Sequence, residues 1–192
     1  MTGWVVFDYG EVICGRTTAL PELADALGAP LAEFEPHYWR LRDAYDRGCP
    51  DLEYWGGIGD ALGVPVDEST SDRLTEIDIR GWSDVREASL ELLARLSEAG
   101  VPLALLSNAP FSFARFAERQ DWMRHFRVRV FSGDVGVAKP DPEIFDLLVA
   151  RLGVPAGDCV FFDDRQSNVD GARAAGLRAH RWDGAEAARA VL

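Results

Sequence analysis

Three features that this sequence lacks exclude whole classes of protein: paired cysteines, long apolar runs and an excess of basic residues. The chain has three cysteines, Cys14, Cys49 and Cys159, which are scattered and form no C-x-x-C pair, so a reducing compartment fits best. No segment reaches the roughly 18 apolar residues of a membrane span. Basic residues are outnumbered, with 20 Lys and Arg against 32 Asp and Glu. The formal net charge of −12 argues against a nucleic-acid or anionic-membrane partner.

A signal for export is also missing from this sequence. The first apolar run begins at Trp4, and no basic n-region or cleavage site precedes it. We therefore expect a cytoplasmic protein. Its 192 residues, of which 47% are hydrophobic, are enough for one substantial core and a small inserted module.

The stretch WVVFDYGEVI, residues 4–13, predicts a carboxylate at the end of a buried strand. Its first four residues are apolar and too few for a helix, which is typical of a central parallel strand buried on both faces. Asp8 follows at the carboxyl end of this strand, where open α/β sheets bind their ligands. A carboxylate must be solvated or paired there. Asp8 is therefore the first candidate functional residue.

The remaining pattern predicts an α/β fold, with a Rossmann-like parallel sheet as core and an inserted helical cap domain. Helix-like segments at 21–27, 31–47, 52–62 and 71–80 follow the first strand without any strand-like run between them. From residue 84 onward, strands expected at 101–106, 128–131, 159–162 and 177–182 alternate with helices. We assign residues 1–14 and 84–192 to the core and residues 15–83 to the cap.

Polar residues stand at the ends of these predicted strands. Asp8 and Ser107 follow two of them, and Asp163 with Asp164 follows a third. Parallel strands end at one edge of the sheet, and Lys139, in the loop before a helix at 142–152, can reach that edge. Carboxylate oxygens suit Mg²⁺, and a hydroxyl and an ammonium suit a phosphoryl group.

Each of these residues also has an ordinary structural explanation. Ser107 can cap the following helix, Lys139 can be a solvated surface lysine, and the Asp163-Asp164 pair can form a turn. Their position after apolar strands favours the metal and phosphate interpretation. We assign no function to the other polar residues nearby or to the histidines, which are Asp141, Glu143, Asp170, His37, His125 and His180.

Four motifs in this order carry a family resemblance: FDYGEVI, LLSNA, AKPDPEIF and FFDDRQSNVDGARAAG. The chain resembles the haloacid dehalogenase superfamily over nearly its whole length, in the subgroup whose helical cap follows the first strand. It is similar in particular to bacterial sugar-phosphate phosphatases of the glucose-1-phosphate type. Each motif alone is weak, but four in the right order on the right elements are specific.

The resemblance implies a nucleophile and a metal site. Asp8 would form an aspartyl-phosphate. Mg²⁺ would be bound next to Asp8 by the backbone carbonyl of Gly10 and the carboxylate of Asp164, with Asp163 beside it, directly or through water.

The resemblance also implies a phosphate site beside the metal. Ser107 and Lys139 would bind the transferring phosphoryl group, and Asn108 would supply its backbone N–H. Asn168 would orient the metal-binding loop, and Lys139 would moderate the crowding of negative charge.

One position departs from the family pattern. Phosphatases of this superfamily usually carry a second aspartate two residues after the nucleophile, which acts as general acid and base and contributes about 10²- to 10⁴-fold. Here that position is Gly10, followed by Glu11. Glu11 or a group of the substrate can replace the missing acid. An anomeric or acyl phosphate needs it least, because its leaving group has a low pKa.

We therefore expect Mg²⁺-dependent hydrolysis of a small phosphorylated metabolite, with sugar phosphates as one candidate class. A 2-haloacid dehalogenase is an alternative, but such enzymes need no metal and lack the paired carboxylates found here at Asp163-Asp164. A catalytically weak binding or regulatory protein is a second alternative, which Gly10 favours. In the cap, no sequence argument selects which side chains contact the substrate among Arg16, Tyr38, Arg42, Tyr45 and Arg47.

Overall fold

A five-stranded parallel sheet forms the centre of the molecule. The computed structural model describes residues 3–192. The strands are β1 (Trp4–Phe7), β2 (Leu103–Ser107), β3 (Phe126–Phe131), β4 (Cys159–Asp163) and β5 (Arg178–Arg181). They lie in the order β3-β2-β1-β4-β5, and every neighbouring pair is parallel. The predicted α/β class with a parallel, Rossmann-like sheet is confirmed.

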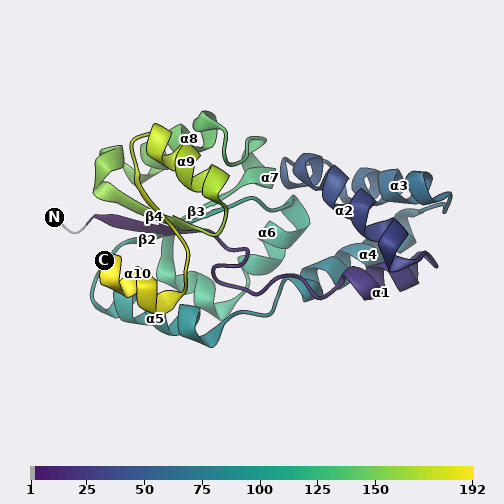
Figure 1. Cartoon of the computed structure of the whole chain (residues 1–192), viewed down its shortest axis with the longest axis horizontal. Helices are drawn as coiled ribbons and strands as arrows, with labels where there is room; N and C mark the ends of the chain where they lie inside the picture. Colours follow the sequence, from purple (N-terminus) through teal and green to yellow (C-terminus); the bar gives the residue numbers. More distant parts are fainter. Residues whose placement is uncertain (1–2) are drawn as a thin grey trace.

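Helices cover both faces of this sheet, as Figure 1 shows. One layer contains α5 (Glu87–Glu98), α6 (Phe111–Ala117) and α10 (Ala185–Val191), and the other contains α8 (Pro142–Leu152) and α9 (Gln166–Ala174). Successive side chains of a strand point to opposite faces, so Val5 and Phe7 enter one core while Val6 enters the other. An apolar run without alternation is therefore what this central strand requires.

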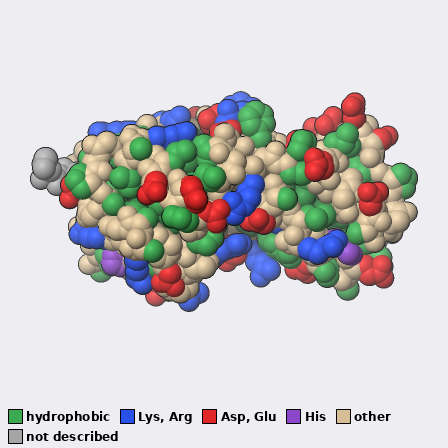
Figure 2. Space-filling model, turned by 90° about the horizontal axis from the view of Figure 1, so that it is seen from above, with side chains coloured by type: hydrophobic (Ala, Val, Ile, Leu, Met, Phe, Trp, Pro, Cys, Tyr) green, Lys and Arg blue, Asp and Glu red, His purple; other side chains and the backbone are tan. Residues whose placement is uncertain are grey.

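Short helical segments complete the core. They are α7 (Ser132–Val135) and the 3₁₀ helices η1 (Asp121–His125) and η2 (Ala156–Asp158). None of the helices in the described part of the chain combines the length and apolarity that crossing a membrane requires. On the face shown in Figure 2, acidic and basic side chains of the described residues lie in small, separate groups rather than in one basic stripe.

Between β1 and α5 the chain forms a helical unit with its own hydrophobic core. It consists of α1 (Leu20–Ala26), α2 (Leu31–Asp46), α3 (Asp51–Leu62) and α4 (Glu68–Gly81). Figure 1 places this unit beyond one end of the sheet, at the edge opposite the N-terminus. Phe34, Tyr38 and Tyr45 on one face of α2 are fully buried in this second core. The aromatic spacing of α2 thus serves packing.

Some predicted boundaries are wrong for identifiable physical reasons. Helix α4 begins at Glu68 rather than at residue 71, because the Asp67 side chain caps it by accepting a hydrogen bond from the Thr70 amide at 2.8 Å. Helix α10 is not predicted from the sequence, since its short alanine-rich pattern has little apolar periodicity. Its buried Ala185 and Ala188 belong to the same core cluster as Leu92 of α5.

The C-terminal end of α2 fastens the helical unit to the core. The Tyr45 hydroxyl lies 3.2 Å from Ser112 Oγ, and Ser132 Oγ donates to the backbone carbonyl of Asp46. One residue further, Arg47 Nη1 donates to Asp141 Oδ2 at 2.6 Å. Three consecutive residues, the last two of α2 and its C-cap Arg47, therefore each contact a different segment of the core, which fixes this helix end relative to the sheet.

Two glycines of α3 offer a matched test of packing in the helical unit. A Cβ added at Gly59 would lie 2.4 Å from the backbone oxygen of Val64, whereas one added at Gly56 meets nothing within 4 Å. We expect Gly59→Ala to lower the free energy of unfolding by about 1–3 kcal/mol through overpacking. Gly56→Ala should raise it by about 0.5–1 kcal/mol through helix propensity. Urea denaturation of both variants measures the difference, and equal effects would contradict the packing described here.

Candidate active site

The sheet register places two aspartates side by side at the carboxyl edge. Phe7 of β1 pairs with Phe162 of β4, and the Asp8 amide donates to the Phe162 carbonyl at 2.9 Å. Asp8 directly follows β1, and Asp163 is the last residue of β4, which extends one residue beyond its predicted end. Both aspartates are buried. Parallel pairing of two apolar strands thus forces two carboxylates together.

Lys139 lies between these carboxylates. Its Nζ lies 2.7 Å from Asp8 Oδ1 and 2.7 Å from Asp163 Oδ2, and it donates to the Leu106 carbonyl at 2.8 Å. The Lys139 side chain is completely buried. It is also the only lysine among the 20 Lys and Arg residues of the chain. This compositional signal in the sequence points to a special site.

The loop that carries Lys139 is held by the side chain of Asn108. Asn108 Nδ2 donates to the Lys139 carbonyl at 2.8 Å, and the Lys139 amide donates to Asn108 Oδ1 at 2.9 Å. This reciprocal pair connects the segment after β2 to the loop before α8. Asn108 therefore positions Lys139, a contribution of its side chain that the sequence does not predict.

Asp163 and Asp164 have different surroundings. Asn168 Nδ2 lies 3.0 and 3.1 Å from the two oxygens of Asp163, and the Arg165 amide donates to Asp163 Oδ1 at 2.9 Å. Together with Lys139, these donors occupy both oxygens of Asp163. Asp164 is only partly buried and lines a cavity. Ligand oxygens of Asp8, Asp163 and Asp164 all lie within 4.8 Å of one another.

This cluster carries an excess of negative charge. Burial raises the pKa of Asp8 to about 8, Lys139 opposes the shift, and Asp163 adds to it. Burial and then Asp163 also raise the pKa of Asp164. Burial alone would lower the pKa of Lys139, but the two adjacent carboxylates raise it above its ordinary value, so Lys139 stays charged. The donor set fits a divalent cation such as Mg²⁺, because oxygen ligands and excess negative charge are what it requires.

A cavity of about 60 Å³ lies over Asp8, between the core and the helical unit. Most residues predicted for the site line it: Asp8, Gly10, Glu11, Ser107, Asn108, Asp164 and Asn168. Lys139 and Asp163 are adjacent to it but do not line it. Ser107 is the last residue of β2 and is buried, so its hydroxyl is held at the sheet edge.

Helix α2 contributes three further lining residues, Trp39, Arg42 and Asp46. Of the cap residues considered from the sequence, only Arg42 lines the cavity. Tyr38 and Tyr45 are buried, while Arg16 is exposed. Asp46 is not predicted from the sequence at all. The only sequence signal for it is its i,i+4 spacing from Arg42, which brings both side chains to one face of the helix.

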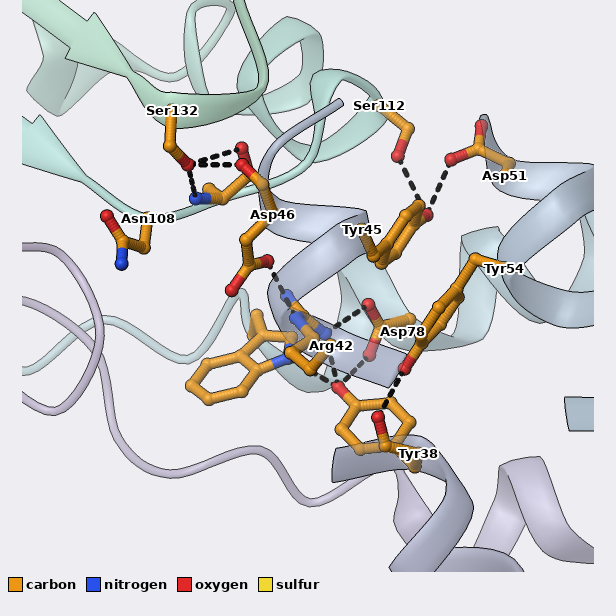
Figure 3. A network of polar contacts seen from close by, with 12 residues as sticks. Tyr38, Arg42, Tyr45, Asp46, Asp51, Tyr54, Asp78, Asn108, Ser112 and Ser132 are labelled. Atoms are coloured by element: carbon orange, nitrogen blue, oxygen red, sulfur yellow. Dashed lines mark hydrogen bonds and ion pairs between the residues drawn. The ribbon is translucent and has the colours of Figure 1, made fainter. Parts of the chain in front are cut away.

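Arg42 organises a polar network under this wall of the cavity, shown in Figure 3. Its Nε donates to Asp46 Oδ1 at 2.8 Å, and its Nη1 donates to Asp78 Oδ2 at 3.1 Å. The Tyr38 hydroxyl donates to Asp78 Oδ1 at 2.6 Å and accepts from Trp82 Nε1 at 3.1 Å. The Arg42 guanidinium therefore donates hydrogen bonds to two carboxylates, those of Asp46 and Asp78.

The loop after Asp8 has glycine, Gly10, at the position two residues after the aspartate, where the family usually has an acid. A Cβ added at Gly10 would have as its nearest contact Trp82 Cζ3, at 3.8 Å, so the position has room for a side chain. Glu11 has φ of 54°, a left-handed conformation that is uncommon for a residue other than glycine. Arg86 Nη1 donates to the Glu11 carbonyl at 3.0 Å and supports this turn.

Comparisons with known proteins identify the family of this chain. The family model described as haloacid dehalogenase-like hydrolase matches residues 4–176. The chain is 36% identical over 182 residues to a phosphorylated carbohydrates phosphatase of Thermotoga maritima, covering 90% of this chain and 81% of that protein. It is 30% identical over 193 residues to a phosphatase of Mycobacterium tuberculosis, covering 93% and 86%. It spans 54% and 62% of the length of two other curated relatives.

A solved structure shares the fold. A haloacid dehalogenase family enzyme from Bacteroides thetaiotaomicron, in complex with magnesium and inorganic phosphate, has a TM-score of 0.76 at 18% identity. The match covers 96% of each chain. With the family model extending from β1 through α9, this chain belongs to the haloacid dehalogenase-like hydrolases.

Proposed function

We propose that this hydrolase is a Mg²⁺-dependent phosphatase that cleaves small phosphomonoesters through an aspartyl-phosphate on Asp8. One observation carries the proposal: oxygens of Asp8, Asp163 and Asp164 lie within 4.8 Å of one another, beside a buried lysine and below a cavity. A nucleophile, a cation site and room for a phosphoryl group thus meet at one point.

In this proposal Mg²⁺ would be held by the carboxylates of Asp8 and Asp164 and by the backbone carbonyl of Gly10. The bound cation would withdraw electron density from the phosphoryl oxygens and so favour attack on phosphorus. Asp163 is better suited to hold Lys139 and the loop after β4, because donors of the protein occupy both of its oxygens.

Asp8 would attack phosphorus, and the bond between phosphorus and the leaving oxygen would break. Water would then cleave the aspartyl-phosphate and restore the carboxylate. The ammonium of Lys139 has three N–H bonds and three oxygen acceptors, on Asp8, Asp163 and Leu106. It can therefore turn to the phosphoryl group only by releasing one of them. Ser107 and backbone N–H groups at the end of β2 supply further donors.

Residues 15–83 would act as the cap that selects the substrate. Support comes from Trp39, Arg42 and Asp46 of α2, which form a wall of the cavity. At roughly 10–15 Å³ per water position, its 60 Å³ holds a phosphoryl group and little more. The substrate would therefore be small, or the cap would open for it. Sugar phosphates are one candidate class, since a relative in Thermotoga maritima is named for phosphorylated carbohydrates.

Phosphate release from a panel of phosphorylated metabolites, with and without Mg²⁺, tests the proposed reaction. We expect turnover only with the metal, and Mg²⁺ should also raise the melting temperature, because it relieves repulsion among the carboxylates. Asp164→Ala should lose both effects. Asp170→Ala is the matched control, since this aspartate is exposed and its polar partners among the described residues, Gln166 and Arg173, both lie on its own helix.

Two results would contradict this assignment. Full activity in the presence of a chelator would exclude the metal from the reaction. Release of chloride from a 2-haloacid without Mg²⁺ would favour the dehalogenase, which uses the same aspartate to displace halide.

The buried cation gives a second prediction, which is independent of turnover. Lys139→Met leaves two buried carboxylates without their shared partner, so we expect it to lower the free energy of unfolding by about 3–5 kcal/mol. Arg80→Met removes an exposed pair with Glu22 and should cost less than about 1 kcal/mol. Chemical denaturation without Mg²⁺ measures both values. A cost for Lys139→Met no larger than that of the control would contradict the role assigned to this lysine.

A further inference from the structure

The proposed reaction requires a proton at the leaving oxygen. An alkoxide is a poor leaving group, and a positioned acid is typically worth about 10²- to 10⁴-fold. Gly10 cannot supply that proton. Asp8 and Asp164 are committed to attack and to metal binding in the proposed function, on which this inference rests. The other carboxylates that line the cavity belong to Glu11 and Asp46.

Asp46 is held so that one of its oxygens remains available. Its backbone carbonyl accepts from Ser132 Oγ of the core, which fixes the end of α2 against the sheet. Its Oδ1 accepts from Arg42 Nε at 2.8 Å. Among the described residues, Oδ2 has no hydrogen-bond partner, and Figure 3 shows it without a dashed line. The side chain is 15% exposed and lines the cavity that also contains Asp8 and Gly10.

The charges around Asp46 favour a proton on this free oxygen. Arg42 is one cation that contacts two carboxylates, the buried Asp78 and the partly buried Asp46, so these three groups together are neutral only when one carboxylate is protonated. Asp78 has donors on both oxygens, from Tyr38 and from Arg42, whereas Asp46 has a donor on one oxygen only. Burial raises the pKa of Asp46 to about 6, although Arg42 lowers it; Asp78 adds to the rise and Arg165 opposes it.

We propose that Asp46, on the helical unit, is the general acid and base of this hydrolase and replaces the aspartate that is missing at Gly10. In the first step Asp8 attacks phosphorus, the electron pair of the broken P–O bond goes to the leaving oxygen, and Asp46 gives that oxygen its proton. In the second step the Asp46 carboxylate takes a proton from the water that attacks phosphorus. The electron pair of the acyl-phosphate bond returns to Asp8, and inorganic phosphate leaves.

Two substrates of similar size, whose leaving groups differ in their need for a proton, test this role. Ethyl phosphate releases an alkoxide that needs a proton, whereas acetyl phosphate releases acetate, which does not. We expect Asp46→Asn to lower kcat/KM for ethyl phosphate by about 10²- to 10⁴-fold and that for acetyl phosphate by less than about tenfold. With acetyl phosphate kcat should fall and the phosphoenzyme should accumulate, because water attack has lost its base.

Asp78→Asn is the matched control. It removes the other carboxylate partner of Arg42, but Asp78 does not line the cavity. It should therefore change both substrates by a similar factor, without accumulation of phosphoenzyme. Adding Gly10→Asp to Asp46→Asn should restore part of the ethyl phosphate activity, because that position has room for a side chain. Such a rescue would show that Asp46→Asn loses activity because a proton donor is missing and not because folding is damaged.

The pH profile provides an independent readout. Asp46 donates only while protonated, so the ratio of kcat/KM for ethyl to acetyl phosphate should fall about tenfold per pH unit above about 6. In Asp46→Asn this tenfold fall per pH unit should be absent. Other charged groups face Asp46 or share its cavity, and they can shift the pH at which this ratio begins to fall. They are Arg42, Asp78, Arg165, Asp8, Asp164 and Glu11.

Two outcomes overturn the role of Asp46 while the phosphatase assignment stands. One is an equal loss for both substrates in Asp46→Asn and Asp78→Asn. The other is a leaving-group dependence that follows Glu11→Gln instead of Asp46→Asn. If the unmodified protein with Mg²⁺ releases phosphate neither from these two substrates nor from any member of the metabolite panel, the proposed function fails, and the role of Asp46 fails with it.

Discussion

The buried ammonium of Lys139 is the interaction on which the site depends. Two carboxylates at the ends of adjacent parallel strands would repel each other in a medium that screens charge poorly. Lys139 contacts both at 2.7 Å, and Asn108 holds the backbone that carries it. The sheet register, the loop before α8 and the cluster of negative charge are therefore mutually dependent. Removing the Lys139 ammonium would leave Asp8 and Asp163 to repel each other without their shared partner.

The second constraint is the attachment of the helical unit at the end of α2. Contacts from Tyr45, Asp46 and Arg47 to three core segments hold one end of the helix over the sheet edge. Arg42, one helical turn earlier, then faces the cavity from the same side. The cavity thus has two walls with separate hydrophobic cores. Chemistry proposed at this site can draw groups from both walls, and motion between them would alter it.

Electrostatics differ between these two walls. On the core wall, one lysine serves Asp8 and Asp163, with Asp164 nearby. On the helical wall, one arginine serves two carboxylates. Each wall therefore holds more negative than positive charge. A divalent cation can balance the negative charge on the core wall, and a proton can balance that on the helical wall. This difference is the physical basis for proposing metal binding on the core wall and proton transfer on the helical wall.

The sequence by itself determined the parallel sheet and the convergence of polar residues at its edge. Apolar strands that end in Asp8, Ser107 and Asp163 permit few other arrangements, because parallel strands end at a common edge. Only the tertiary structure decided which residues of the helical unit reach that edge. Asp46 looks like any exposed aspartate of a helix, and its position depends on how α2 packs on Ser132, a contact between residues distant in the chain. Helix periodicity specifies a face but not what that face meets.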